Sequence, residues 1–319
     1  MRTFRRKRHA GRGFTLAELI VAMAVTVILL GLLVSVTGVA LDGWRMSRNK
    51  VRAARQAKAA LEQISRDFES MVARSGNIYE WLYTESDPNE APGPGDGVKS
   101  RNAARMIFFT AATDRYDGRV GPDSNNPGDV SAVGYRLVYK DPITDSDDDD
   151  YSVFVLYRRL VDPREGGEGS EEGAFYDLLA QEDLEAAFEV NYGATVEDSE
   201  NFICENIFEM SVVFTIEYMA EAGGSPVARI QRVPVLATRK GPDAVSEFRL
   251  KGDGIVADGN AETDYADGRI VAVDVSISVL TDNGVATLRR DADLEGDRLA
   301  DFLARNSYRF SKTIMLPQP

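Results

Sequence analysis

The densest group of side chains that could do chemistry is an acidic run, DSDDDDY, in the middle of the chain. Asp145, Asp147 and Asp149 stand at alternate positions, the spacing of oxygen ligands in a calcium-binding loop. The run departs from an EF-hand, because Asp150 stands where that loop needs glycine and Leu156 where it needs a bidentate glutamate. A solvated hairpin tip is the favoured interpretation, and a calcium site completed by other loops is the alternative. No other cofactor is expected.

The other reactive side chains are scarce. His9 is the only histidine and lies among basic residues, so the main part of the chain has no Ser-His-Asp triad, histidine zinc site or histidine base. Cys204 is the only cysteine, and its apolar surroundings, ENFICENIFEM, favour a buried small hydrophobe over a reactive thiol. We find no catalytic motif and expect no enzyme.

One carboxylate stands in an unusual place. Glu18 lies near the start of a long apolar run, and Leu19 to Leu41 are 23 residues without a charge. At about 1.5 Å per residue they span roughly 35 Å as a helix, enough to cross a hydrocarbon core of about 30 Å. A carboxylate at membrane depth costs about 2.5–3.5 kcal/mol, so we expect a partner that offsets its charge. A glutamate near the interface that reaches water is the plainer alternative.

The elements that position Glu18 are a basic leader and the apolar segment. Residues 1–12 carry six Lys or Arg, and six more follow between residues 45 and 58, so positive charge alone does not decide the orientation. The run is longer than the apolar core of an ordinary signal peptide, although Gly38-Val39-Ala40 has the small-residue spacing of a signal peptidase site.

The stretch RGFTLAELIVAMAV resembles the N-terminal signal of type IV prepilins and type II secretion pseudopilins. The resemblance implies that a prepilin peptidase cuts after Gly13 and methylates the new terminus at Phe14. It also implies that Glu18 pairs with the amine of Phe14, its own or a neighbour's, and sets subunit register in a filament. The leader then stays cytoplasmic, and the rest of the chain, past a single membrane span, lies in the periplasm before filament assembly.

One departure from the family is the lack of a mid-helix proline, since the first proline is Pro88. Gly31 and Gly38 are the positions where we expect local flexibility instead.

The helix is expected to continue as an amphipathic segment to about residue 75, where Gly76 reads as a stop. Beyond it, a helix is predicted at 175–188 and a short one within 291–306. Strands are predicted at 104–112, 131–140, 151–161, 207–219, 245–251, 269–281 and 308–316. The fold class is therefore α+β, with a long N-terminal transmembrane and amphipathic helix packed on a head with an antiparallel sheet, the pilin-like lollipop.

The predicted domains are a leader (1–13), a membrane half of the helix (14–41), its amphipathic continuation (42–75) and a head (76–319). Residues 75–319 carry 23 basic and 46 acidic side chains, a charge that disfavours nucleic acid as a partner. The head resembles large minor pseudopilins of the J or W type, through IFEMSVVFTIEYM, RIVAVDVSISVL and FSKTIML. The tail FSKTIMLPQP also resembles the Verrucomicrobia-type cassette protein C family.

The resemblance implies a minor subunit of a pilus-like filament for secretion or attachment. Its partners are then prepilin peptidase, other pilins or pseudopilins, an inner-membrane assembly platform and membrane lipid. The alternatives are a membrane-anchored, adhesin-like binding protein that never polymerises, and an exported hydrolase. A Glu18→Ala variant separates the filament subunit from the non-polymerising anchor, because only the filament subunit should lose incorporation while its membrane insertion stays normal.

Overall fold

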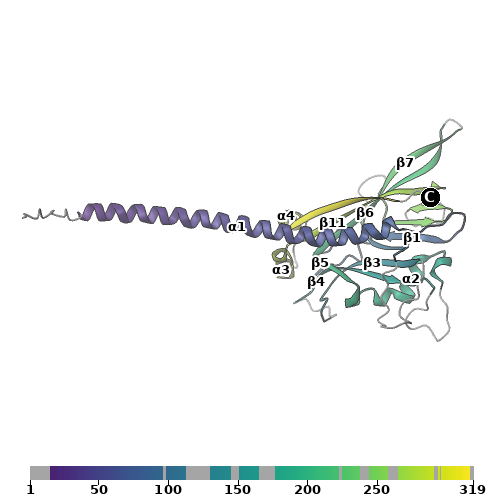
Figure 1. The fold of residues 1–319 in the computed structure, drawn as a ribbon, viewed down its shortest axis with the longest axis horizontal. Coiled ribbons are helices and arrows are strands. Elements are labelled where there is room, and N and C mark those ends of the chain that lie inside the picture. The colour runs from purple at the N-terminus through teal and green to yellow at the C-terminus, as the bar shows by residue number, and fades with distance from the viewer. Residues whose placement is uncertain are drawn as a thin grey trace, which may run out of the picture. The chain divides into compact units, whose positions relative to one another are not determined.

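The computed structural model describes residues 15–95, 98–112, 130–144, 151–164, 177–222, 225–237, 244–257, 265–290, 294 and 296–316. The chain divides into two compact units, the first ending at Asn49 and the second beginning at Lys50. The described part of the first unit is almost entirely helix. The second unit contains the last turns of that helix and all the described strands (Figure 1).

Helix α1 (Leu16–Glu69) confirms the long N-terminal helix, and it runs through Gly31 and Gly38 without a break. The predicted end near residue 75 is wrong, because the chain leaves the helix at Ser70. Met71 then bridges to Thr110, and the N–H of Val72 donates to a carbonyl of the same strand at 2.8 Å. These sheet bonds replace the last predicted helical turns.

Gly76 does not end the helix, as the sequence suggested, but lies in a separate turn after it. Its φ of 76° lies in the left-handed region that glycine tolerates, and its N–H donates to the carbonyl of Gly252 at 2.7 Å. This turn leads the chain into the first strand of the second unit.

The described strands form two antiparallel sheets. One has the order β10-β9-β8-β1-β2-β3-β4-β5 and the other the order β12-β11-β6-β7. Their bounds are β1 (Glu80–Glu85), β2 (Arg105–Thr110), β3 (Ser131–Lys140), β4 (Val153–Val161), β5 (Phe202–Glu205), β6 (Ile207–Ala222), β7 (Ser225–Val235), β8 (Glu247–Lys251), β9 (Gly254–Ala257), β10 (Tyr265–Ala266), β11 (Arg269–Leu280) and β12 (Ser307–Met315). The α+β class with an antiparallel head is confirmed. The predicted strands are all present, whereas β1, β5, β7, β9 and β10 were not predicted.

Three shorter α-helices lie among the described residues of the second unit: α2 (Leu184–Tyr192), α3 (Asp282–Arg290) and α4 (Gly296–Asn306). The predicted helix at 175–188 is only partly correct. Asp177 caps a separate 3₁₀ turn at Leu178–Ala180, and Asp183 then caps α2 by accepting from the N–H of Ala186 at 3.1 Å. Each aspartate acts as an N-cap and begins a separate helical segment, so one continuous helix does not form.

Strand β3 is covered on both faces, which explains its nearly continuous burial. On one face Tyr135 meets α1. On the other, a side chain at Gly134 would come within 2.6 Å of the Phe188 ring of α2. Glycine is therefore required where α2 crosses the sheet.

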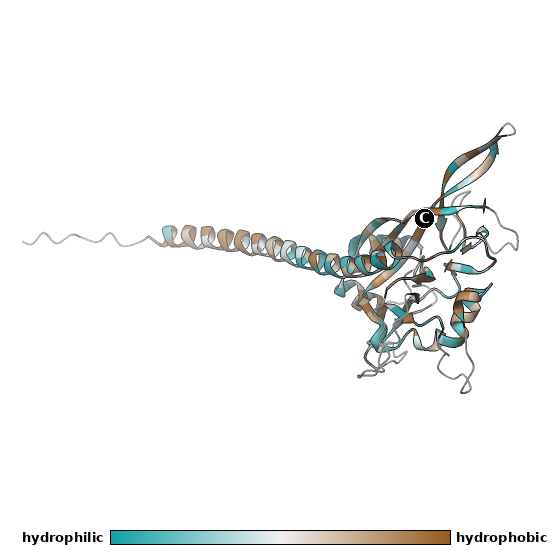
Figure 2. Ribbon diagram, turned by 45° about the vertical axis from the view of Figure 1, so that its right-hand side comes forward, coloured by the Kyte–Doolittle hydropathy of each residue, from teal (hydrophilic) through white to brown (hydrophobic). Residues whose placement is uncertain are grey.

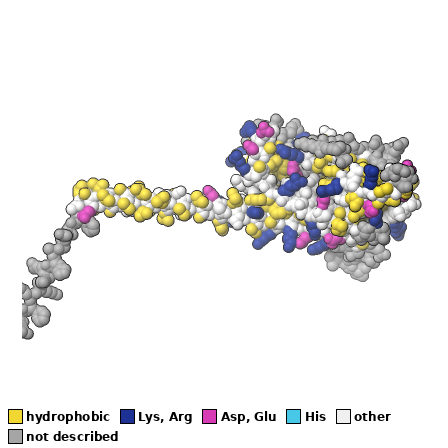
Figure 3. All heavy atoms as spheres, turned by 90° about the horizontal axis from the view of Figure 1, so that it is seen from above, with side chains coloured by type: hydrophobic (Ala, Val, Ile, Leu, Met, Phe, Trp, Pro, Cys, Tyr) yellow, Lys and Arg dark blue, Asp and Glu magenta, His cyan; other side chains and the backbone are white. Residues whose placement is uncertain are grey.

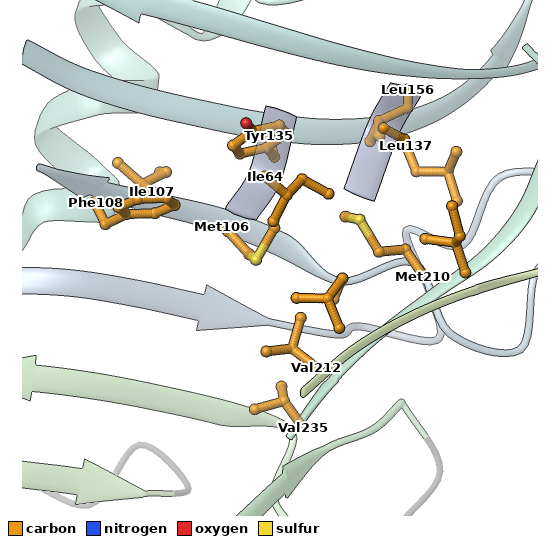
Figure 4. Packing of buried hydrophobic residues seen from close by; sticks show 14 of the residues in the cluster. Ile64, Met106, Ile107, Phe108, Tyr135, Leu137, Leu156, Met210, Val212 and Val235 are labelled. Atoms are coloured by element: carbon orange, nitrogen blue, oxygen red, sulfur yellow. The ribbon is translucent and has the colours of Figure 1, made fainter. Parts of the chain in front are cut away.

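The core lies where the end of α1 meets both sheets (Figure 4). Phe68 of α1 stacks on Phe108 of β2 at 4.3 Å between ring centroids. Phe208 of β6 meets Phe154 of β4 edge-on at 5.0 Å, so β6 packs on the same face of the larger sheet as α1. The α1 side of this core is a stripe at three- and four-residue spacing, made by Ala53, Ala57, Ala60, Leu61, Ile64 and Phe68.

Candidate membrane anchor and assembly site

The described helix of the first unit presents an apolar surface (Figures 2 and 3). Leu16, Val34 and Val39 are 79%, 71% and 73% exposed, and no described residue of this unit is buried. Among the described helices, α1 alone is long and apolar enough to cross a membrane. A surface of this size in water would drive association, so lipid or other apolar helices must cover it.

Polar side chains within this surface are satisfied locally. The hydroxyl groups of Thr26 and Thr37 each donate at 2.8 Å to the carbonyl four residues earlier, on Ala22 and Leu33. Such bonds let threonine lie in hydrocarbon without an unpaired hydroxyl. The helix is therefore suited to lipid along its whole apolar length.

The start of the helix is closed by a reciprocal pair of side chains. Glu18 Oε2 accepts from the Thr15 N–H at 2.8 Å and from the Thr15 hydroxyl at 3.0 Å. The Glu18 N–H donates in return to Thr15 Oγ1 at 3.3 Å. This is a capping box, in which two helix-terminal donors are satisfied at once. Within the described residues Oε1 has no bond to a donor, so half of the carboxylate stays free for another partner.

The predicted processing residues, Gly13 and Phe14, lie outside the described residues. Their geometry relative to Glu18 is therefore not part of the site that the structure describes. The assignment of cleavage to Gly13, methylation to Phe14 and register to Glu18 remains a prediction from the sequence.

The far end of the apolar run has the composition of a membrane interface. Trp44 is 60% exposed, and the Arg48 guanidinium lies 5.7 Å from its ring centroid. Arg45 approaches Asp42 at 3.8 Å. Tryptophan and arginine are residues that often anchor helices at the headgroup level, and this composition agrees with membrane anchoring.

In the second unit, a buried charge ties α1 to the larger sheet. Asp67 is 1% exposed and accepts from Arg158 Nε at 2.7 Å, from Arg158 Nη2 at 2.9 Å and from the Tyr135 hydroxyl at 2.5 Å. Burial and the negative charge of Asp67 raise the pKa of Tyr135 well above its usual value, so the phenol stays a donor. The bonds fix the rotation of the last turns of α1 on β3 and β4. The sequence did not single out Asp67, because its partners lie far away along the chain.

A polar pocket of about 300 Å³ lies between α2 and strands β1–β3. Its two arginines are already held by acids: Arg105 reaches Glu85 at 2.7 Å, and Arg136 reaches Glu189 at 2.5 Å. The lining contains no histidine, cysteine, serine or threonine. The pocket therefore offers ion pairs that join α2 to the sheet.

Cys204 lies in β5 and is buried. Burial, with a smaller effect from Glu205, raises the pKa of its thiol to about 12. The thiolate is therefore rare at neutral pH, in agreement with a packing role.

The calcium candidates, Asp145, Asp147 and Asp149, also lie outside the described residues. Among the residues that the structure does describe, no group of three or more acidic, histidine or cysteine side chains is placed to hold a metal ion.

Glu80 gives a prediction for the pH dependence of stability. Its side chain is fully buried, accepts from the N–H of Leu184 at 2.6 Å and lies 3.3 Å from Arg249. Burial raises the pKa of Glu80 to about 7, although Arg249 and the Leu184 amide act in the opposite direction. The folded chain thus holds this proton more tightly than the unfolded chain. The contribution of Glu80 to stability is therefore fully present at low pH and is lost as pH rises through about 7.

Relative to a Glu80→Gln variant, the wild type should lose about 2.5 kcal/mol of unfolding free energy between pH 5 and pH 8. Urea titrations of both proteins at several pH values measure this difference. Parallel pH profiles for the two proteins would contradict the assignment to Glu80.

A comparison with protein-family models matches residues 8–34 to the prokaryotic N-terminal methylation motif. The N-terminal segment thus carries the prepilin-type methylation motif, which supports a type IV pilin-like protein. The match covers the leader and the apolar half of α1, the segment that holds Glu18 and its capping box. Comparisons with curated proteins and with solved structures gave no match.

For a type IV pilin-like protein, the motif implies processing by prepilin peptidase and association with other pilins in general. The exposed apolar helix of the same segment agrees with membrane anchoring. Proteins of this kind are generally structural rather than enzymatic.

Proposed function

We propose that this chain is a minor pilin or pseudopilin, of the large J or W type, that joins a pilus-like filament for secretion or surface attachment. In this proposal the peptidase cuts after Gly13 and methylates Phe14. The chain waits in the inner membrane as a single-pass protein, with its N-terminus cytoplasmic and its head in the periplasm, and then moves into the filament. It is no enzyme, and it works through contacts.

The methylation motif on an uncovered apolar helix carries this proposal. Lipid can cover the helix before assembly and neighbouring helices can cover it afterwards, because both are apolar. Glu18 adds support, since Oε1 is left without a bond in the described residues and is available to the amine of Phe14, its own or that of a neighbouring subunit. The large acidic head favours a minor or tip position over that of a repeating subunit.

A membrane-anchored binding protein that never polymerises is the second candidate. The capping box favours it, because a bond to Thr15 gives Glu18 a purely local reason to be present. The two candidates differ in what Glu18 does after the leader is removed.

Mass spectrometry of the mature N-terminus tests the proposed processing. We expect a chain that begins at Phe14 and carries one N-methyl group, in cells that contain a prepilin peptidase. A Gly13→Val variant should keep its leader, because the peptidase requires the small residue there, and it provides the matched control. A mature chain that begins at Leu41 would identify an ordinary secreted protein, and an intact Met1 would identify an uncut anchor.

A further inference from the structure

The smaller sheet of the second unit ends in a two-stranded ribbon that runs on beyond its neighbours (Figure 1). We call Glu217–Glu221 of β6 and Pro226–Ile230 of β7 the distal ribbon. Ile230, Met219 and Val227 on it are 71%, 55% and 45% exposed. At its base, Glu217 pairs with Arg269 of β11 and the Tyr218 ring meets Tyr265 of β10 at 4.8 Å. Apolar side chains project from the ribbon beyond these contacts, and a two-stranded ribbon is only marginally stable in water by itself.

Strand β7 is an edge strand, and its register shows which backbone groups point away from β6. The carbonyl of Pro234 accepts from the N–H of Val245 at 2.9 Å, so position 234 faces outward. The β6–β7 register has no bulge, so every second residue back from Pro234 faces outward as well. These residues are Arg232, Ile230, Ala228 and Pro226.

The outward edge is open only over a short window. Within the described residues, no bond is made by the outward N–H groups of Ala228, Ile230 and Arg232. Pro226 at one end and Pro234 at the other have no N–H to offer. An added strand could therefore accept from three outward N–H groups at alternate positions, and a proline bounds this window at each end.

The charge of β7 indicates what kind of strand fits. The strand carries Arg229 and Arg232 and no acid, in a head with twice as many acidic as basic side chains. Arg232 is paired with Asp274 at 2.5 Å, whereas no described acid pairs with Arg229. A second copy of β7 would bring the same two cations, so self-pairing of this edge is disfavoured. The hydrocarbon core of a bilayer would leave the three outward donors without acceptors, which is costly.

We propose that the open edge of β7 binds an extended, acidic segment of another protein as an added strand, centred on Ile230. Ala228, Ile230 and Arg232 supply the main-chain bonds, Arg229 supplies charge, and the exposed apolar side chains of the distal ribbon supply contact area. The inference concerns the head alone, and it holds equally for a subunit that polymerises and for an anchor that does not.

Hydrogen exchange of the full-length chain in detergent micelles tests the inference. The probe is a synthetic peptide of alternating Glu and Val with the length of β7, and the matched control is the same peptide with Lys in place of Glu. The Glu-Val peptide should slow exchange of the Ala228, Ile230 and Arg232 amides about tenfold or more. The amides of Val227 and Arg229 should not change, because they already bond to β6.

Two variants separate main-chain pairing from side-chain contact. Ile230→Pro removes one outward donor and leaves the β6 ladder whole, and it should weaken peptide binding about tenfold, whereas Ile230→Thr should bind nearly as well as the wild type. Arg229→Glu should shift the preference towards the Lys-Val peptide, whereas Arg55→Glu on exposed α1 should not.

The alternating pattern of protection is the deciding result. No protection by the Glu-Val peptide, equal protection by the Lys-Val peptide, or unchanged binding to the Ile230→Pro variant would each overturn the inference. Protection of the same amides by anionic phosphatidylglycerol vesicles would also overturn it, in favour of a lipid surface.

Discussion

Replacing Asp67 with alanine should lower the unfolding free energy of the second unit by about 3–5 kcal/mol. The Arg158 side chain is 8% exposed, and the substitution would leave its guanidinium buried without the carboxylate that now accepts two of its N–H groups. The Tyr135 hydroxyl would lose its acceptor as well. The cost is large because a buried charge that loses its carboxylate is worse off than either an intact pair or an apolar residue.

Urea denaturation in micelles, followed by the fluorescence of buried Trp81 in a Trp44→Phe background, measures this loss. Glu62→Ala is the matched control, because Glu62 makes an exposed pair with Lys58 on the same helix and should cost less than about 1 kcal/mol. The double variant Asp67→Leu with Arg158→Met should recover most of the loss. A cost for Asp67→Ala no greater than that of the control would refute the anchoring role.

Replacing Glu18 with glutamine should reduce incorporation into filaments tenfold or more while membrane insertion stays normal. Glutamine keeps the size of the side chain and an oxygen that can serve in the capping box, but it has no charge to pair with the amine of Phe14. Insertion should become slightly easier, because a charge at membrane depth is removed. Immunoblots of membrane and sheared filament fractions, from cells that assemble the filament, measure both quantities.

A Thr15→Val variant is the control that isolates the capping box. It removes the hydroxyl that bonds to Glu18 but keeps the carboxylate, so it should assemble nearly as well as the wild type. If Thr15→Val failed to assemble while Glu18→Gln assembled normally, Glu18 would be only a helix cap. The chain would then be better described as a membrane-anchored binding protein.

The strands that the sequence predicted are those whose patterns are local. The run at 104–112 became β2, because side chains buried on both faces leave a continuous apolar signature. The run at 269–281 became β11, where buried apolar residues largely alternate with polar residues such as Asp274 and Ser276. Strand β7 was missed because Pro226 and Pro234 argue against a strand. The structure explains both prolines, since each lies at an outward position of an edge strand, where no N–H is needed.

The end of α1 is a feature that the local sequence pattern did not predict correctly. The amphipathic spacing continues to Met71, but tertiary bonds to β2 end the helix at Glu69. The same holds for α2, where two aspartate caps divided a segment that a helical period would have joined.

The sequence alone determined the membrane anchor and the processing motif, because both depend on residues close together in the chain. Glu18, its distance from Phe14 and the charge-free run after it need no fold to be recognised. Only the tertiary structure decided the pairing of Asp67 with Arg158, the burial of Glu80 and the open window on β7. These features depend on segments that lie far apart in the chain and are brought together by the core. An apolar pattern in the sequence predicts that a side chain is buried, but it does not predict which residues that side chain contacts.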